Sequence, residues 1–128
     1  MENTSTRPAV ASITEAEIQD GKLMAILAYI IFLIPLIAAR DKKYAMFHTE
    51  QALILVIAWV IIYIAFTIVT IILSKISSAL SCGAGIISIL IWVAYLVMWI
   101  MGLINAAQGK VKELPIIGSY GAKLNLVK

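Results

Sequence analysis

The sequence is organised around residues 40–51, R-D-K-K-Y-A-M-F-H-T-E-Q, which continue without a helix breaker into the apolar segment 52–74. This charged stretch contains three of the ten basic residues, two of the seven acidic residues and the only histidine. Apolar runs too long for the core of an ordinary soluble domain lie on both sides of it. The charged stretch is therefore expected at a membrane surface, and the other segments are placed relative to it.

The composition of the 128-residue chain is that of a membrane protein. Apolar residues make up 62% and charged residues 13% of the sequence, and the mean hydropathy is +1.01. So few polar residues cannot cover that much apolar surface in water. The pI of about 9.1 comes from basic residues in short segments between the apolar runs, which indicates anionic lipid headgroups as partners and no nucleic acid.

Three apolar segments, at about residues 23–39, 52–74 and 86–107, are long enough to cross a bilayer as helices. Pro35 lies in the first of them and frees the carbonyl of Ile31, which predicts a kink or an early end of that helix. Small residues dominate 76–85, which we expect to form a loop. The predicted fold class is all-α, an integral membrane bundle of three transmembrane helices.

Two polar segments flank the predicted transmembrane domain, residues 22–109. The N-terminal segment, 1–21, carries Thr14 and Glu17 at capping-box spacing, which predicts an amphipathic or interfacial helix from about residue 14. We expect the first dozen residues to lack regular structure. The C-terminal segment, 110–128, is basic and is expected to lie on the membrane surface.

Charge bias predicts the orientation. Seven of the Lys and Arg residues lie in 40–43 and the tail, and the other three are Arg7 and Lys22, before the first span, and Lys75, in the loop after the second span. With three spans, the positive-inside rule places the charged stretch and the C-terminus in the cytoplasm and the N-terminus outside a plasma membrane. The basic side chains expected to contact anionic headgroups are Arg40, Lys42, Lys43, Lys110 and Lys112.

Catalytic patterns are absent from the sequence. Cys82 lies in the predicted outer loop and His48 at the inner end of the second span, so about 30 Å of bilayer separates the only thiol from the only imidazole. No H-E-x-x-H motif occurs, and Gly109-Lys110 lacks the remainder of a phosphate-binding loop. The spans contain no charged residue, which argues against a proton relay. We expect no enzymatic activity, no cofactor and no metal.

The spans contain patterns that indicate helix packing. Gly102 and Ala106 have the small-xxx-small spacing that lets two helices approach closely. At 1.5 Å per residue the Trp and Tyr side chains of the second and third spans lie at matching depths, so they either pair between antiparallel helices or face lipid. The predicted helix-packing face consists of Trp59, Tyr63, Tyr95, Trp99, Gly102 and Ala106.

Polar residues gather where the second and third spans reach the inner surface. Polar groups at that depth need partners because lipid offers none, so we predict an interhelical polar cluster of His48, Gln51, Asn105 and Gln108. The resulting hypothesis is a non-enzymatic protein that acts through helix–helix association, as a homo-oligomer or an accessory or scaffold subunit. The alternative is a small channel or transporter subunit in which Thr67, Thr70, Ser88 and Asn105 line a polar path after oligomerisation.

Several stretches also resemble a known family. L-A-Y-I-I-F-L-I-P-L-I-A-A-R-D-K-K-Y-A-M-F-H-T-E-Q, then I-N-A-A-Q-G-K and L-P-I-I-G, are similar to a widespread prokaryotic family of small membrane proteins with no settled function. That family is distantly similar to the chloroplast import component Tic-twenty and to the magnetosome protein MamF. The resemblance covers about residues 22–120. It implies a helical bundle and work alongside other membrane proteins, with no catalytic role for the matching residues Phe47, His48, Gln51, Asn105, Gly109 and Lys110.

Overall fold

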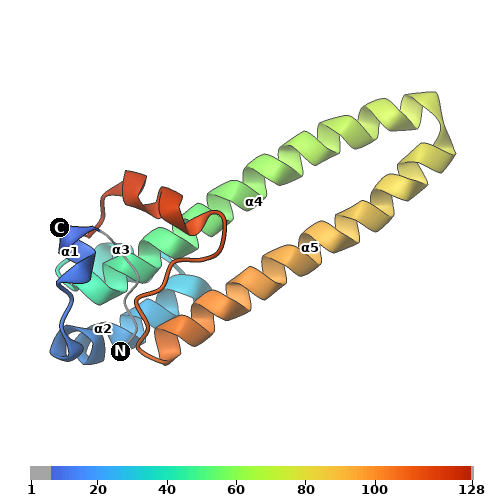
Figure 1. Ribbon diagram of the computed structural model, residues 1–128. Coiled ribbons are helices and arrows are strands. Elements are labelled where there is room, and N and C mark those ends of the chain that lie inside the picture. Colours follow the sequence, from blue (N-terminus) through green and yellow to red (C-terminus); the bar gives the residue numbers. More distant parts are fainter. Residues whose placement is uncertain (1–6, 128) are drawn as a thin grey trace.

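The computed structural model describes residues 7–127 of the chain. Figure 1 shows two long helices side by side as a hairpin, with the shorter helices gathered at one end. We call that end the near end, and the turn of the hairpin the far end. The all-α fold class is confirmed. The elements are α1 (Pro8–Ala11), α2 (Glu15–Ile30), α3 (Leu33–Ala38), α4 (Lys43–Ile76), α5 (Ser78–Ala107) and the 3-10 helix η1 (Gly118–Leu124).

Helix α2 begins where the sequence predicts. Thr14 is its N-cap, and its hydroxyl accepts a hydrogen bond from the Glu17 N–H while the Glu17 carboxylate accepts one from the Thr14 N–H, both at 3.2 Å. This capping box satisfies two N–H groups that the helix itself leaves unpaired. The preceding segment differs from expectation, because residues 8–11 form α1. The rest of that expectation concerns residues 1–6, which lie outside the described residues.

The first predicted span, residues 23–39, is not one continuous helix. Helix α2 ends at Ile30, Ile31 has extended backbone, and α3 is a separate short helix. Pro35 explains the break, because it has no N–H to offer the Ile31 carbonyl and its ring would clash with that carbonyl in a continuous helix. The chain then turns back to the near end, where the Lys42 ammonium lies 3.1 Å from the Asp20 carboxylate.

The charged stretch 40–51 supplies the centre of the near end. Helix α4 begins at Lys43 and continues to Ile76, which confirms one unbroken helix through the charged stretch and the second apolar run. All eight residues from 44 to 51 are buried. Helices α1, α2, α5 and η1 all contact α4, so every side of its first two turns is covered by protein.

One residue separates α4 from α5. Ser77 is extended, ends α4 and caps α5, with its hydroxyl accepting a hydrogen bond from the Ala79 N–H at 3.2 Å. The loop predicted for residues 76–85 is therefore mostly the first turns of α5. Cys82 lies exposed on this helix at the far end.

Helices α4 and α5 are the two helices in residues 7–127 that are long and apolar enough to cross a membrane. In their most apolar 18-residue stretches only 11% and 6% of the residues are buried within the chain, whereas the core helix of a soluble protein is mostly buried. Their exposed isoleucine, valine and leucine side chains require an apolar solvent. The structure is that of a membrane protein with two membrane-capable helices in place of the predicted three.

Both ends of the described chain lie at the near end. The Arg7 guanidinium and the Leu126 N–H both bond to the carboxylate of Glu50. Three crossings would place the two ends at opposite ends of the molecule, and this arrangement is not seen. The physical reason is the break at Ile31, after which the chain returns to the near end.

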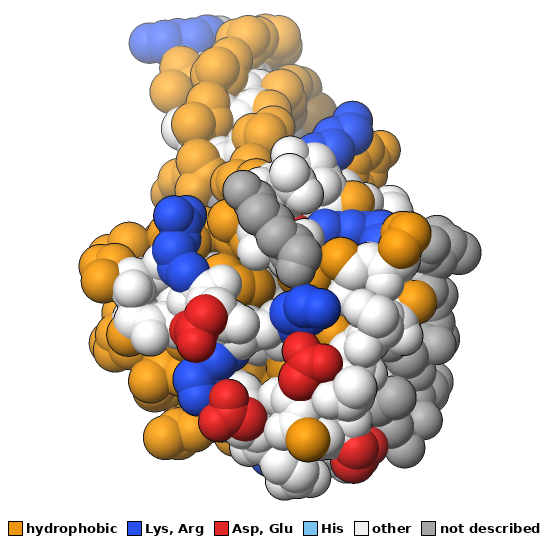
Figure 2. Space-filling model, turned by 90° about the vertical axis from the view of Figure 1, so that its left-hand side faces the viewer, with side chains coloured by type: hydrophobic (Ala, Val, Ile, Leu, Met, Phe, Trp, Pro, Cys, Tyr) orange, Lys and Arg blue, Asp and Glu red, His pale blue; other side chains and the backbone are white. Residues whose placement is uncertain are grey.

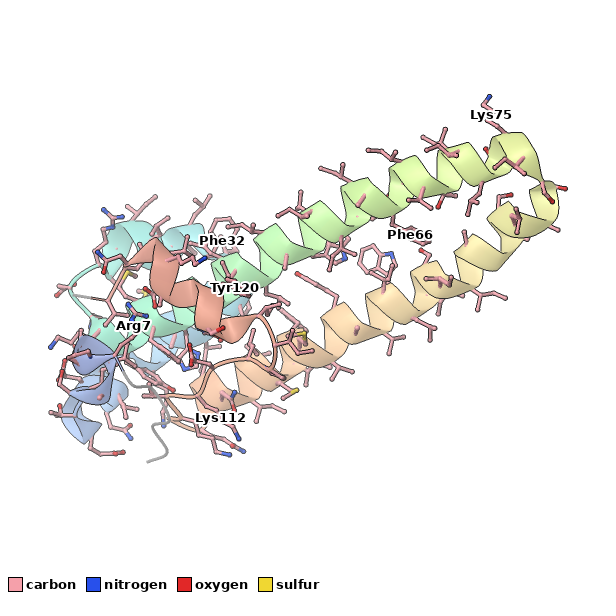
Figure 3. All side chains as sticks on the ribbon, turned by 45° about the horizontal axis from the view of Figure 1, so that its top comes forward. Arg7, Phe32, Phe66, Lys75, Lys112 and Tyr120 are labelled. Atoms are coloured by element: carbon pink, nitrogen blue, oxygen red, sulfur yellow. The ribbon has the colours of Figure 1, made fainter. Side chains whose placement is uncertain are left out.

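The charged side chains are also distributed unevenly between the near end and the far end. Figure 2 looks at the near end and shows acidic and basic side chains across this face, with the apolar hairpin behind it. Figure 3 shows Arg7 and Lys112 at the near end and Lys75 at the far tip. Of the nine Lys and Arg residues that the structure describes, Lys75 is the one at the far end.

Candidate functional site

The strongest candidate site is the polar core of the near end, which consists of His48, Glu50 and Gln51 on α4 with their partners. All three side chains are buried. Buried polar groups are stable only when they are hydrogen-bonded. The partners of these three residues therefore decide what the site is able to do.

His48 connects the tip of α2 to the segment after α5. Its Nε2 lies 2.9 Å from the carbonyl oxygen of Lys110, and its Nδ1 lies 2.8 Å from the Tyr29 hydroxyl. Because a carbonyl only accepts, we assign the ring proton to Nε2, and Nδ1 then accepts from Tyr29. Burial, and next the adjacent Tyr44 hydroxyl, raise the pKa of Tyr29 far above its ordinary value, so Tyr29 stays a donor.

Aromatic rings enclose the imidazole. The ring centres of Tyr29, Tyr44 and Phe47 lie 5.6, 4.8 and 5.1 Å from that of His48, in edge-on arrangements. The Tyr44 hydroxyl donates to the carbonyl of Ala106 at 2.9 Å. The last four carbonyls of a helix have no partner within it, so Tyr44 caps the C-terminus of α5 in place of a residue from α5 itself.

Glu50 holds the two ends of the chain. Its carboxylate accepts from both terminal nitrogens of the Arg7 guanidinium, at 2.6 and 3.2 Å, and from the Leu126 and Val127 N–H groups, at 2.8 and 3.4 Å. A two-pronged guanidinium–carboxylate contact is among the stronger charge-assisted hydrogen bonds. Glu50 is therefore a structural carboxylate whose charge is balanced within the chain.

Gln51 holds the tail against α4. Its amide nitrogen donates to the Gly118 carbonyl at 3.0 Å, and its amide oxygen accepts from the Leu114 N–H at 2.9 Å. A Cβ at Gly118 or Gly121 would lie 2.7 or 2.8 Å from this amide. The tail approaches Gln51 this closely because those two positions have no side chain.

The structure separates the four residues of the predicted interhelical polar cluster. His48 bonds to the Lys110 carbonyl and to the Tyr29 hydroxyl, and Gln51 bonds to the Gly118 carbonyl. Asn105 contributes its backbone carbonyl, which lies 3.2 Å from the Tyr44 hydroxyl. Gln108 is exposed. The partners that sequence reasoning missed are Arg7, Tyr29, Tyr44 and Glu50. Among these four, only Glu50 had a feature in the sequence that could have identified it, since it is a single acidic residue just before a long apolar run.

The predicted helix-packing face is divided between two contacts. Trp59 packs against Trp92 and Tyr95, with ring centres 4.9 and 5.5 Å apart, and stacks on Tyr63 of its own helix. Trp99, the expected partner of Trp59, instead donates to the carbonyl of Tyr29 at 2.7 Å.

Gly102 serves the contact between α5 and α2. A Cβ there would collide with the Tyr29 ring, so this glycine leaves room for Tyr29 and not for α4. Ala106 is fully buried in the same region. The small-xxx-small pattern thus accommodates α2 within the chain.

The basic residues predicted to contact headgroups all lie at the near end. Arg40, Lys42 and Lys43 lie between α3 and the start of α4, and Lys42 is paired with Asp20. Lys110 and Lys112 follow α5, where the Lys110 carbonyl accepts from His48. In residues 7–127 no three His, Cys, Asp or Glu side chains lie close enough to hold a metal ion.

Comparison with known proteins gives one match. Residues 20–120 match the model of the magnetosome magnetite crystal formation protein family, which supports the resemblance to the magnetosome protein MamF and does not bear on the resemblance to Tic-twenty. No curated protein and no solved structure matches significantly.

Proposed function

The chain belongs to the magnetosome magnetite crystal formation protein family, and we propose that it is a non-enzymatic membrane scaffold. It crosses the membrane twice, through α4 and α5, and acts by associating with itself or with another membrane protein. The observation that carries this proposal is that the buried polar side chains form hydrogen bonds within the chain itself. His48, Glu50 and Gln51 each bond to backbone far along the chain, and this leaves them no free role in acid–base or nucleophilic chemistry.

The orientation we propose follows from the positive-inside rule applied to two crossings. Eight of the nine described basic residues lie at the near end, and Lys75 lies at the far end. The near end then faces the cytoplasm of a prokaryotic cell, with both ends of the chain on that side.

The family description names magnetite crystal formation, and the charge distribution indicates how this chain would contribute to it. Imidazole and carboxylate groups are usual protein ligands of iron. The acidic residues within 7–127 belong to near-end segments, whereas the far end carries Lys75 and the hydroxyls of Ser77, Ser78 and Ser81. We therefore propose that the chain organises the membrane or its proteins and does not bind the mineral directly.

Two exposed glycines support association within the membrane. Gly83 and Gly85 lie on α5, and an added Cβ at either would meet nothing within 4 Å. Each glycine in a helix costs about 1 kcal/mol relative to alanine, and no contact within the chain compensates for that cost. Glycines in membrane helices allow a second helix to approach closely. In an assembly, a helix of another subunit would pack against these two positions.

The test is the oligomer mass of the purified protein in mild detergent and in bilayers. We expect a dimer or larger assembly that Gly83→Leu or Gly85→Leu weakens, with little change in thermal stability because both positions are open. Ile86→Leu, which keeps the bulk of an exposed side chain, is the matched control. A monomer at all concentrations, or an assembly indifferent to both glycine variants, would remove self-association from the proposal.

The channel alternative has less support. Thr67 and Thr70 donate to the carbonyls of Tyr63 and Phe66 in their own helix, so their hydroxyls are already paired. Asn105 lies 17 residues after Ser88 on α5, a separation of about 25 Å along the helix. Within one chain, Thr67, Thr70 and Ser88 line a common depression between α4 and α5, and Asn105 is not part of that lining.

A further inference from the structure

A groove runs between α4 and η1 on the outer surface of the protein. It encloses about 380 Å³. One wall is a stripe of α4 that includes Ile54, Ile57 and Ile61, and the other wall is formed by Ile117, Tyr120 and Lys123. Figure 3 shows η1, with Tyr120, alongside α4 where that helix leaves the near end. The surface of the groove is apolar, and Tyr120 and Lys123 are the lining residues that carry a polar group.

The depth of the groove follows from the position of Lys75. A charged side chain at the far end marks one boundary of the hydrocarbon core. A core of about 30 Å corresponds to about 20 helical residues, which places the opposite boundary near Leu55. The groove therefore begins at the boundary, at Ile54, and reaches into the hydrocarbon at Ile61. Ile116, beside η1, is 90% exposed, as expected for a side chain that meets lipid.

The charge at the mouth of the groove selects the occupant. The Lys123 ammonium lies 5.2 Å from the centre of the Tyr120 ring. The ion pairs recorded among residues 7–127 join Arg7 to Glu50 and Lys42 to Asp20, and Lys123 takes part in neither. An ammonium at the boundary of the hydrocarbon complements a phosphate, and the isoleucine stripe below it complements an acyl chain.

We propose that this groove binds one anionic phospholipid, with its phosphate at Lys123 and an acyl chain along Ile54, Ile57 and Ile61. The proposal rests on the membrane insertion of α4, but it requires neither self-association nor a particular orientation. An apolar helix from a second copy fits less well, because it would bury the Lys123 ammonium without a partner.

Native mass spectrometry of the full chain in mild detergent tests this site, with phosphatidylglycerol and phosphatidylcholine as probes. We expect one tightly held phosphatidylglycerol per chain and weaker retention of phosphatidylcholine. A basic side chain near an anionic lipid contributes about 1 kcal/mol, so Lys123→Gln should weaken phosphatidylglycerol binding about fivefold. The matched control is Lys75→Gln, which removes the far-end lysine and should leave binding unchanged.

A second pair of variants tests the acyl-chain wall. Ile61→Trp fills the groove and should lower lipid retention, whereas Ile72→Trp on the far part of α4 should not. Equal retention of both lipids together with no effect of Lys123→Gln would overturn the proposal. So would an Ile61→Trp variant that loses a dimer and no lipid, since the groove would then be an interface between copies. The same spectra report the oligomer mass separately, so failure of the lipid site and failure of the scaffold proposal are distinguishable.

Discussion

At the scale of single residues, the near end is held by contacts between residues that lie far apart in the chain. Tyr29 shows this most clearly, because it packs on Gly102, its carbonyl accepts from Trp99, and its hydroxyl donates to His48. One tyrosine thus fixes α2 to α5 and supplies the donor for the Nδ1 of the buried histidine.

Tyr29→Phe isolates the hydroxyl, since phenylalanine keeps the ring against Gly102. The variant leaves the Nδ1 of His48 buried without a donor, which should cost about 1–3 kcal/mol and lower the melting temperature in detergent. Tyr63→Phe, on an exposed tyrosine of the hairpin, is the control. If the two variants melt alike, the Tyr29–His48 bond contributes nothing to stability.

At the scale of elements, local signals set where the helices begin and end. The Thr14–Glu17 capping box starts α2, Pro35 separates α2 from α3, and Ser77 separates α4 from α5. Each is a short sequence feature with a local mechanism, and the first two were readable from the sequence alone.

Thr14→Ala should remove the capping box and destabilise the first turn of α2 by about 1 kcal/mol. Hydrogen exchange measures this directly, as faster exchange of the amides at the start of α2 with little change in α5. Ser12→Ala is the control, because the Ser12 hydroxyl bonds only to the Ala9 carbonyl of α1 among the described contacts. Unchanged exchange in Thr14→Ala would mean that tertiary packing, and not the cap, holds this end of α2.

At the scale of the whole molecule, the proposed topology places both ends of the described chain on one side of the membrane. In a Cys82→Ser background, the Ser12→Cys and Ser119→Cys variants place one thiol near each end, at exposed positions of the near end. A membrane-impermeant maleimide should label Cys82 of the wild-type protein in intact cells. The two near-end variants should be labelled only after lysis.

The pattern of labelling separates the possible topologies. Labelling of the Ser12→Cys variant in intact cells, with protection of Ser119→Cys, would restore the predicted three crossings. Labelling of both near-end variants in intact cells, with protection of Cys82, would keep two crossings and invert the orientation. A denatured sample controls for thiols that are merely inaccessible.

The sequence by itself determined that the apolar segments need a lipid environment, that the fold is all-α, and that α4 is continuous. Those properties depend on the number and order of apolar residues and on local breakers, and both are legible in one chain. It also placed the capping box and predicted that Pro35 would kink the first helix or end it early.

Only the tertiary structure decided how many helices are long enough to cross a membrane and which residues meet. A hydropathy pattern counts apolar residues but cannot distinguish a crossing segment from one that breaks at Ile31 and returns. His48 and Gln51 bond to backbone carbonyls more than sixty residues away, and every residue offers such a carbonyl, so nothing in the sequence marks the partner. Gly102 signals the close approach of a neighbour. That the neighbour is Tyr29, and not α4, follows from the packing of α2 against α5.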